Sequence, residues 1–141
     1  MTSASAVSTA STSTHPLSFL AFDFGAKRVG VATGNTLTRS ATPLRTVASL
    51  GEQRCAAIAA WIDEWRTDAL VVGVPFHPDG AAHDNTDRAR RFARQLQGRF
   101  KIEVHEVDER YTTTEAAAGS ARDLDAASAA IILNQFLSHL A

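Results

Sequence analysis

Acidic residues at the ends of predicted elements are the groups in this chain best suited to chemistry. Asp23 closes an apolar run of strand length at residues 17–23, Asp108 and Glu109 close a later one, and Asp125 opens the last predicted helix. An ionised carboxylate at the end of a buried strand is costly unless a cation or hydrogen-bond donors meet it. One divalent cation would compensate all of them at once. Because hard oxygen ligands without clustered Cys or His favour Mg²⁺ or Mn²⁺ over Zn²⁺, the pattern predicts such a metal site.

Asp23 and Asp125 also have ordinary structural explanations. Asp23 could cap backbone N–H groups of the turn that follows it, or pair with Lys27 or Arg28. Asp125 could be a helix N-terminal residue favoured by capping and by the helix dipole. However, Asp125 stands at helical spacing before Ala129 and further apolar residues, so its side chain is expected on a face that packs against the sheet.

The Asp108 and Glu109 pair leaves open which carboxylate faces the others. Along a strand, Glu109 shares its face with Val107. Asp108 shares the opposite face with Val104, so only one of the two is expected to face the other acidic residues. The alternative for both is a solvated loop pair bridged to Arg110.

Apolar patterning predicts the elements that must position these residues, in the order βββαβαβαα and hence as a mixed sheet with flanking helices. The predicted strands cover residues 17–23, 29–33, 42–47, 69–74 and 101–107, and the first three form an antiparallel meander with Gly34-Asn35 as a turn. The predicted helices begin at Gly51, run from residues 84–86 to a stop at Gly98, and cover residues 113–118 and 124–139.

Length and composition favour one compact domain. The chain has 141 residues, 45% of them hydrophobic, and 14 Lys and Arg against 15 Asp and Glu give a formal charge of −1, which excludes a polybasic, histone-like protein. Residues 1–16 are almost entirely Ser, Thr and Ala and predict a disordered tail, so the folded domain is expected over residues 17–141. No apolar run approaches the ~20 residues that cross a bilayer, and the one Cys permits no disulfide scaffold. We expect a cytoplasmic protein with no membrane partner.

Basic residues gather along the second predicted helix. Within 14 residues lie Arg88, Arg90, Arg91, Arg94, Arg99 and Lys101. Because phosphate contacts supply most non-specific affinity for nucleic acids, this cluster predicts a nucleic-acid surface, with Arg88 and Arg91 as candidate contacts. The alternative is a solvated arginine-rich face.

Several motifs together resemble the YqgF/RuvX family, described as candidate Holliday-junction resolvases and pre-16S rRNA nucleases. They are residues 22–32 (FDFGAKRVGVA), 71–75 (VVGVP), 86–90 (TDRAR), 107–113 (VDERYTT) and 125–133 (DAASAAIIL). The resemblance implies an RNase H-like α/β fold, with a mixed five-stranded sheet flanked by helices. It also implies catalytic and metal-binding roles for Asp23, Glu109 and Asp125, with Lys27, Arg28 and Arg110 as further nucleic-acid contacts.

The function implied by the resemblance is a Mg²⁺- or Mn²⁺-dependent endonuclease that matures the 5′ end of precursor 16S ribosomal RNA during ribosome biogenesis. Its partner would be structured RNA, or branched DNA if it resolves Holliday junctions. Two other classes stay open: an ATPase fragment like actin or the sugar kinases, which also begin with D-x-G, and a non-catalytic binding module in ribosome assembly or transcription. The module is favoured by the segment before Asp125. Members of the family usually have a longer, basic and glycine-containing segment there, whereas this chain has only residues 115–124, with Arg122 as their sole cation. The shorter segment would grip a substrate less well.

Overall fold

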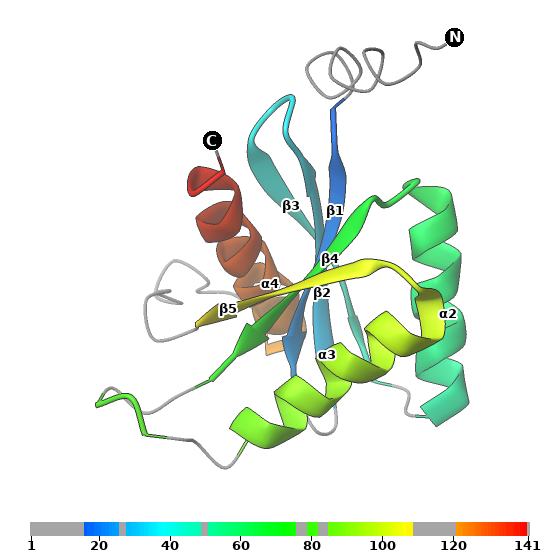
Figure 1. Ribbon diagram of the computed structural model, residues 1–141, viewed down its shortest axis with the longest axis vertical. Coiled ribbons are helices and arrows are strands. Elements are labelled where there is room, and N and C mark those ends of the chain that lie inside the picture. Colours follow the sequence, from blue (N-terminus) through cyan, green and yellow to red (C-terminus); the bar gives the residue numbers. More distant parts are fainter. Residues whose placement is uncertain are drawn as a thin grey trace, which may run out of the picture.

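The computed structural model describes residues 16–25, 28–48, 51–75, 79–81, 85–108 and 121–140, with side chains from residue 125 onward in the last segment. These residues form five strands and three helices (Figure 1). The strands are β1 (Ser18–Phe24), β2 (Val29–Asn35), β3 (Ser40–Val47), β4 (Ala69–Val74) and β5 (Glu103–Asp108). The helices are α2 (Gly51–Glu64), α3 (Thr86–Phe100) and α4 (Ala121–Ser138).

The five strands form one mixed sheet in the order β3-β2-β1-β4-β5. β1 pairs antiparallel with β2, and β2 antiparallel with β3, which confirms the predicted meander. β4 lies parallel to both β1 and β5. β1 is therefore the central strand, and its end is the natural place for a residue that must meet side chains from several elements.

Side chains of β1 alternate between two apolar layers. Leu20 and Phe22 pack in a core with residues of α2 and α3, such as Ile58. Phe19 and Ala21 pack on the opposite face with residues of α4, in a second core. Figure 1 shows α3 in front of the sheet and α4 behind it. Each helix thus covers the sheet with an apolar surface.

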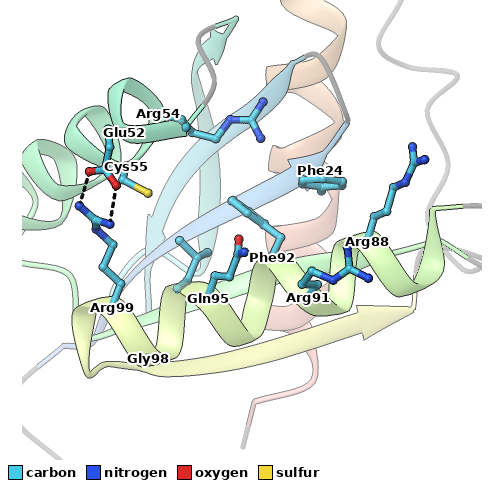
Figure 2. A pocket seen from close by; sticks show the side chains of 12 residues that line it. Phe24, Glu52, Arg54, Cys55, Arg88, Arg91, Phe92, Gln95, Gly98 and Arg99 are labelled. Carbon is cyan, nitrogen blue, oxygen red and sulfur yellow. Dashed lines mark hydrogen bonds and ion pairs between the residues drawn. The ribbon is translucent and has the colours of Figure 1, made fainter.

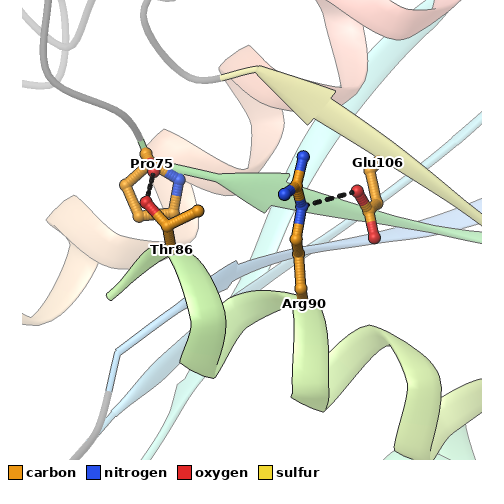
Figure 3. A network of polar contacts seen from close by, with 4 residues as sticks. All are labelled: Pro75, Thr86, Arg90 and Glu106. Carbon is orange, nitrogen blue, oxygen red and sulfur yellow. Dashed lines mark hydrogen bonds and ion pairs between the residues drawn. The ribbon is translucent and has the colours of Figure 1, made fainter. Parts of the chain in front are cut away.

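Polar contacts attach the start of α3 to the sheet (Figure 3). The hydroxyl of Thr86, a buried residue, donates a hydrogen bond to the carbonyl oxygen of Pro75, directly after β4. One turn further on, Nε of Arg90 lies 3.3 Å from Oε1 of Glu106 on β5. The first turn of α3 is therefore held beside the carboxyl ends of β4 and β5.

Two glycine-based predictions of element ends are wrong. Gly34 and Asn35 belong to β2, and the turn is formed by residues 36–39, where Arg39 takes the positive φ of 53°. Gly34 is needed in the strand because a Cβ there would lie 2.8 Å from the carbonyl oxygen of Ser40. Likewise α3 continues past Gly98 and ends when Lys101 adopts a left-handed φ of 56° and donates its N–H to the carbonyl of the residue four positions back.

Smaller differences concern boundaries. The third strand begins at residue 40 and not 42, the fifth at 103 and not 101, and α4 at 121 and not 124. The predicted tail, apart from Pro16, and the helical segment at 113–118 lie outside the described residues. In the described part of the chain, no helix is long and apolar enough to span a membrane.

Candidate active site

Asp23 lies near the end of the central strand, between two glycines. Gly30 is its partner on β2 and Gly73 its partner on β4. By strand alternation the half-buried Asp23 shares the face of Phe19 and Ala21, which is the face covered by α4. Because neither lateral neighbour has a side chain, backbone from another element can approach the sheet beside this carboxylate.

Gly30 also brings the start of α4 onto this spot. A Cβ built on Gly30 would lie 1.8 Å from the carbonyl oxygen of Asp125 and 2.8 Å from the backbone nitrogen of Ala126, so the first turns of α4 rest directly on the β2 backbone. Gly30 is the cross-strand partner of Asp23, and neighbouring strands are about 4.8 Å apart. The structure therefore brings two of the three predicted acidic residues, Asp23 and Asp125, to one place.

Asp125 is partly covered and lies beside a cation. Its Oδ2 atom is 3.0 Å from Nε of Arg28, and the two side chains are 24% and 52% exposed. The contact is an ion pair without hydrogen-bond geometry, because the buried Oδ2 accepts no hydrogen bond from any residue that the structure describes. A buried carboxylate oxygen of this kind suits a hard metal ion.

The third predicted carboxylate, Glu109, lies outside the described residues, as do Lys27 and Arg110. The strand before Glu109 packs against α4. Val107 lies in the α4 layer, and the ring centroids of His105 and of Phe136 on α4 are 4.9 Å apart. Among the residues with described positions, no group of three His, Cys, Asp or Glu side chains could hold a metal. The Glu109 ligand thus stays a prediction.

The other predicted nucleic-acid contacts lie on the opposite face of the sheet. Arg88 and Arg91 line a cavity of about 710 Å³ between α2 and α3, with Phe24 of β1 at one end (Figure 2). Arg28, in contrast, lies at the acidic site. The predicted basic surface is therefore divided between the two faces.

Sequence reasoning missed Gly30 and Gly73, whose importance depends on strand register. It also missed Arg54 of α2, a buried residue in the same cavity as Arg88. The available signal was its spacing of four residues before the apolar Ile58, on the same face of the helix.

Comparisons with known proteins agree on the family. A family model described as "RuvX: Holliday junction resolvase" matches residues 17–139. A protein of Polaromonas sp. (strain JS666 / ATCC BAA-500) named "putative pre-16S rRNA nuclease" is 66% identical over 122 residues, covering 86% of this chain and 88% of that protein. A protein of the same name from Albidiferax ferrireducens is 67% identical over 119 residues, covering 84% and 76%.

Among solved structures, the chain is similar to RuvC from T. thermophilus in complex with a Holliday junction substrate. The TM-score is 0.54 at 14% identity, covering 86% of this chain and 93% of that one. A second T. thermophilus RuvC structure gives a TM-score of 0.52 at 13% identity. At this identity the likeness concerns the fold alone, and it confirms the predicted RNase H-like architecture.

Proposed function

Because the chain belongs to the RuvX family, we propose that it is a hydrolase, a metal-dependent endonuclease that cleaves phosphodiester bonds at the 5′ end of precursor 16S rRNA in the cytoplasm. Residues 17–141 would form the nuclease domain. The observation that carries the proposal is the placement of the Asp125 backbone on Gly30, the cross-strand partner of Asp23. Two carboxylates on different elements are thereby held at the end of the central strand.

Asp23 and Asp125 fit a hard divalent cation because both offer carboxylate oxygens at one end of the sheet, and Oδ2 of Asp125 is buried beside a cationic side chain. Together with Glu109 they would hold Mg²⁺ or Mn²⁺. When bound, such an ion supplies Lewis-acid chemistry, polarising a phosphoryl oxygen and lowering the pKa of water. Glu109 is included because the family motif implies it, and because alternation continued from β5 would give it the face of Val107, which packs in the α4 layer.

Arg28 is suited to contact the substrate backbone. Its guanidinium lies 3.0 Å from Asp125, yet half of its side chain is exposed, so it can also reach a phosphate group. Guanidinium groups bind phosphate oxygens through paired, charge-assisted hydrogen bonds. We assign Lys27 and Arg110 the same role from the family motif. These cations would hold the scissile strand beside the carboxylates and orient its phosphate.

A second candidate substrate is the four-way DNA junction. The description of the matching family names a Holliday junction resolvase, whereas the names of the similar Polaromonas and Albidiferax proteins specify precursor rRNA. The higher specificity of those names, at 66% and 67% identity, favours RNA. Both substrates would use the same carboxylates, so the choice depends on groups outside the metal site.

The test compares cleavage of a precursor 16S rRNA fragment and of a DNA four-way junction, with Mg²⁺, with Mn²⁺ and with EDTA. The wild type should cut the RNA only with metal, and Asp23→Asn and Asp125→Asn should each abolish cleavage while the far-UV circular dichroism spectrum and the melting temperature stay close to wild type. Asp63→Asn on the exposed face of α2 is the matched control and should cleave normally.

The outcomes separate the function classes. Cleavage of junction DNA in preference to RNA would replace the rRNA substrate with the resolvase activity. ATP hydrolysis without nuclease activity would favour the kinase-like ATPase, and RNA binding without turnover in any metal would favour the binding module. Full activity of Asp23→Asn would remove the acidic site from the mechanism.

A further inference from the structure

We infer that the cavity between α2 and α3 binds a single-stranded segment of nucleic acid that flanks the cleaved bond. The inference rests on the proposed nuclease function and adds to it the form of substrate. The cavity has a volume of about 710 Å³, within the range of sites that enclose small ligands. It therefore suits nucleotides that enter singly, rather than a paired helix.

The charge of the cavity is positive. Four arginines line it, Arg54, Arg88, Arg91 and Arg99, against one carboxylate, Glu52. That carboxylate is engaged, because its two oxygens lie 2.7 and 3.1 Å from the terminal nitrogens of Arg99, which lowers the pKa of Glu52. Arg54, Arg88 and Arg91 also line the cavity, and guanidinium groups are of the kind that phosphates select (Figure 2).

Arg54 makes this more than a solvated basic face. The residue is only 8% exposed, and burial lowers its pKa, so the fold bears the desolvation of this guanidinium inside the cavity wall. Its Cζ atom lies 5.9 Å from the centroid of the Phe24 ring. The cavity wall therefore holds one guanidinium within the fold as well as those on its surface.

The cavity also offers an aromatic surface. Phe24 is half-buried, and its ring centroid lies 5.0 Å from that of Phe92 at an interplanar angle of 37° (Figure 2). Aromatic rings beside a positively charged groove are the combination with which proteins bind single strands, since every base has a face that can stack. Phe24 is the candidate stacking platform.

Strand geometry connects this cavity to the acidic site. Phe24 directly follows Asp23 on β1, and successive side chains of a strand point to opposite faces. The Asp23 carboxylate and the Phe24 ring therefore lie on opposite faces of the sheet at the end of β1. At the other end of the cavity, the Glu52–Arg99 ion pair joins α2 to α3. A single-stranded nucleic acid that passes from the acidic site around the end of β1 would enter the cavity at Phe24.

The experiment measures binding by fluorescence anisotropy in EDTA, so that cleavage plays no part. An RNA hairpin with a single-stranded tail is compared with the same hairpin without it. The wild type should bind the tailed RNA more tightly by about tenfold, the contribution of roughly one stacked base. Arg88→Gln with Arg91→Gln should remove this preference and reduce the salt dependence of tailed-RNA binding by about 1.4 in log–log slope, since each single-strand phosphate contributes about 0.7.

Arg94→Gln is the matched control, because Arg94 is exposed on the same helix and does not line the cavity. It should keep the preference for the tail. Phe24→Leu should lose the preference but keep the salt slope. The inference is overturned if the wild type shows no preference, if the control loses as much as the double variant, or if a free mononucleotide competes as well as the tailed RNA.

Failure of this inference and failure of the nuclease proposal are distinguishable. Tail-dependent binding without metal-dependent cleavage would retain the cavity as a single-strand site and remove the nuclease function. Cleavage that depends on Asp23, with no effect of the tail, would do the reverse. The arginines exchanged are exposed, so loss of folding does not explain loss of binding.

Discussion

Gly30→Ala should damage the acidic site without touching any acidic residue. The new Cβ would lie 1.8 Å from the Asp125 carbonyl oxygen, and such contacts do not occur below 3.0 Å, so one backbone must move by about 1.2 Å. β2 is paired on both sides, with β1 and β3, and cannot yield easily. The start of α4 must therefore move, carrying the Asp125 carboxylate with it.

The size of the effect follows from this displacement. Overpacking a well-filled interior costs about 1–3 kcal/mol of folding free energy. A misplacement of about 1 Å at a reacting centre can cost about 100-fold in rate. We expect urea denaturation to show the loss of folding free energy. Cleavage rates should show the loss of activity, together with a higher Mn²⁺ concentration for half-maximal activity, because one proposed ligand, Asp125, has shifted.

Gly98→Ala is the stability control for this substitution. The same methyl group meets no atom within 4 Å there and replaces glycine inside a helix, so it should stabilise the fold by up to about 1 kcal/mol. Retention by Gly30→Ala of wild-type stability and of the wild-type Mn²⁺ dependence would refute the idea that close contact between α4 and β2 positions Asp125.

Three further substitutions test contacts around the two faces. Arg28→Ala should change unfolding free energy by less than about 1 kcal/mol, since the pair with Asp125 is half-exposed, but should increase the rise in melting temperature caused by Mn²⁺, because a competing cation is gone. Thr86→Val leaves the Pro75 carbonyl without its buried donor and should cost about 1–3 kcal/mol in urea denaturation. The pKa of Glu52 lies below its ordinary 4.5 because it accepts hydrogen bonds from an arginine of α3. Its contribution to stability is therefore present above pH 4.5 and lost as the pH falls through the lower folded value, and Glu52→Gln should flatten the acid side of a melting-temperature profile.

The element predicted most accurately from the sequence is one that is buried on both faces. The apolar run at residues 69–74 forms β4 with the predicted bounds, since a strand covered on both faces is hydrophobic throughout. Glycine signals failed because one residue type serves different purposes. Gly34 admits a neighbouring backbone and Gly98 lies inside a helix, whereas the actual helix end uses a left-handed Lys101.

The sequence predicts that the acidic residues converge, but it does not show by what means their elements come together. The backbone of Asp125 lies beside Asp23 because Gly30 is the partner of Asp23 on β2 and lies beneath the start of α4. That arrangement depends on the register between β1 and β2. It also depends on where α4, about 95 residues later in the chain, packs against the sheet. Neither can be predicted from the local sequence pattern, because that pattern indicates which residues are buried but not which strands and helices pack together.

The formal charge of −1 conceals a division of charge between the two faces of the sheet. Asp23 and Asp125 lie on the α4 face, where a hard cation is favoured, whereas the arginine-lined cavity lies on the face covered by α2 and α3. Arg28 lies with Asp125 on the acidic face, whereas the arginines of the cavity do not; placed there too, they would neutralise the carboxylates and compete with a metal ion. Alternation of side chains at the end of β1 places the Asp23 carboxylate and the Phe24 ring of the cavity on opposite faces of the sheet. A neutral protein can therefore bind polyanions, because the distribution of its charges, and not their sum, sets the local field.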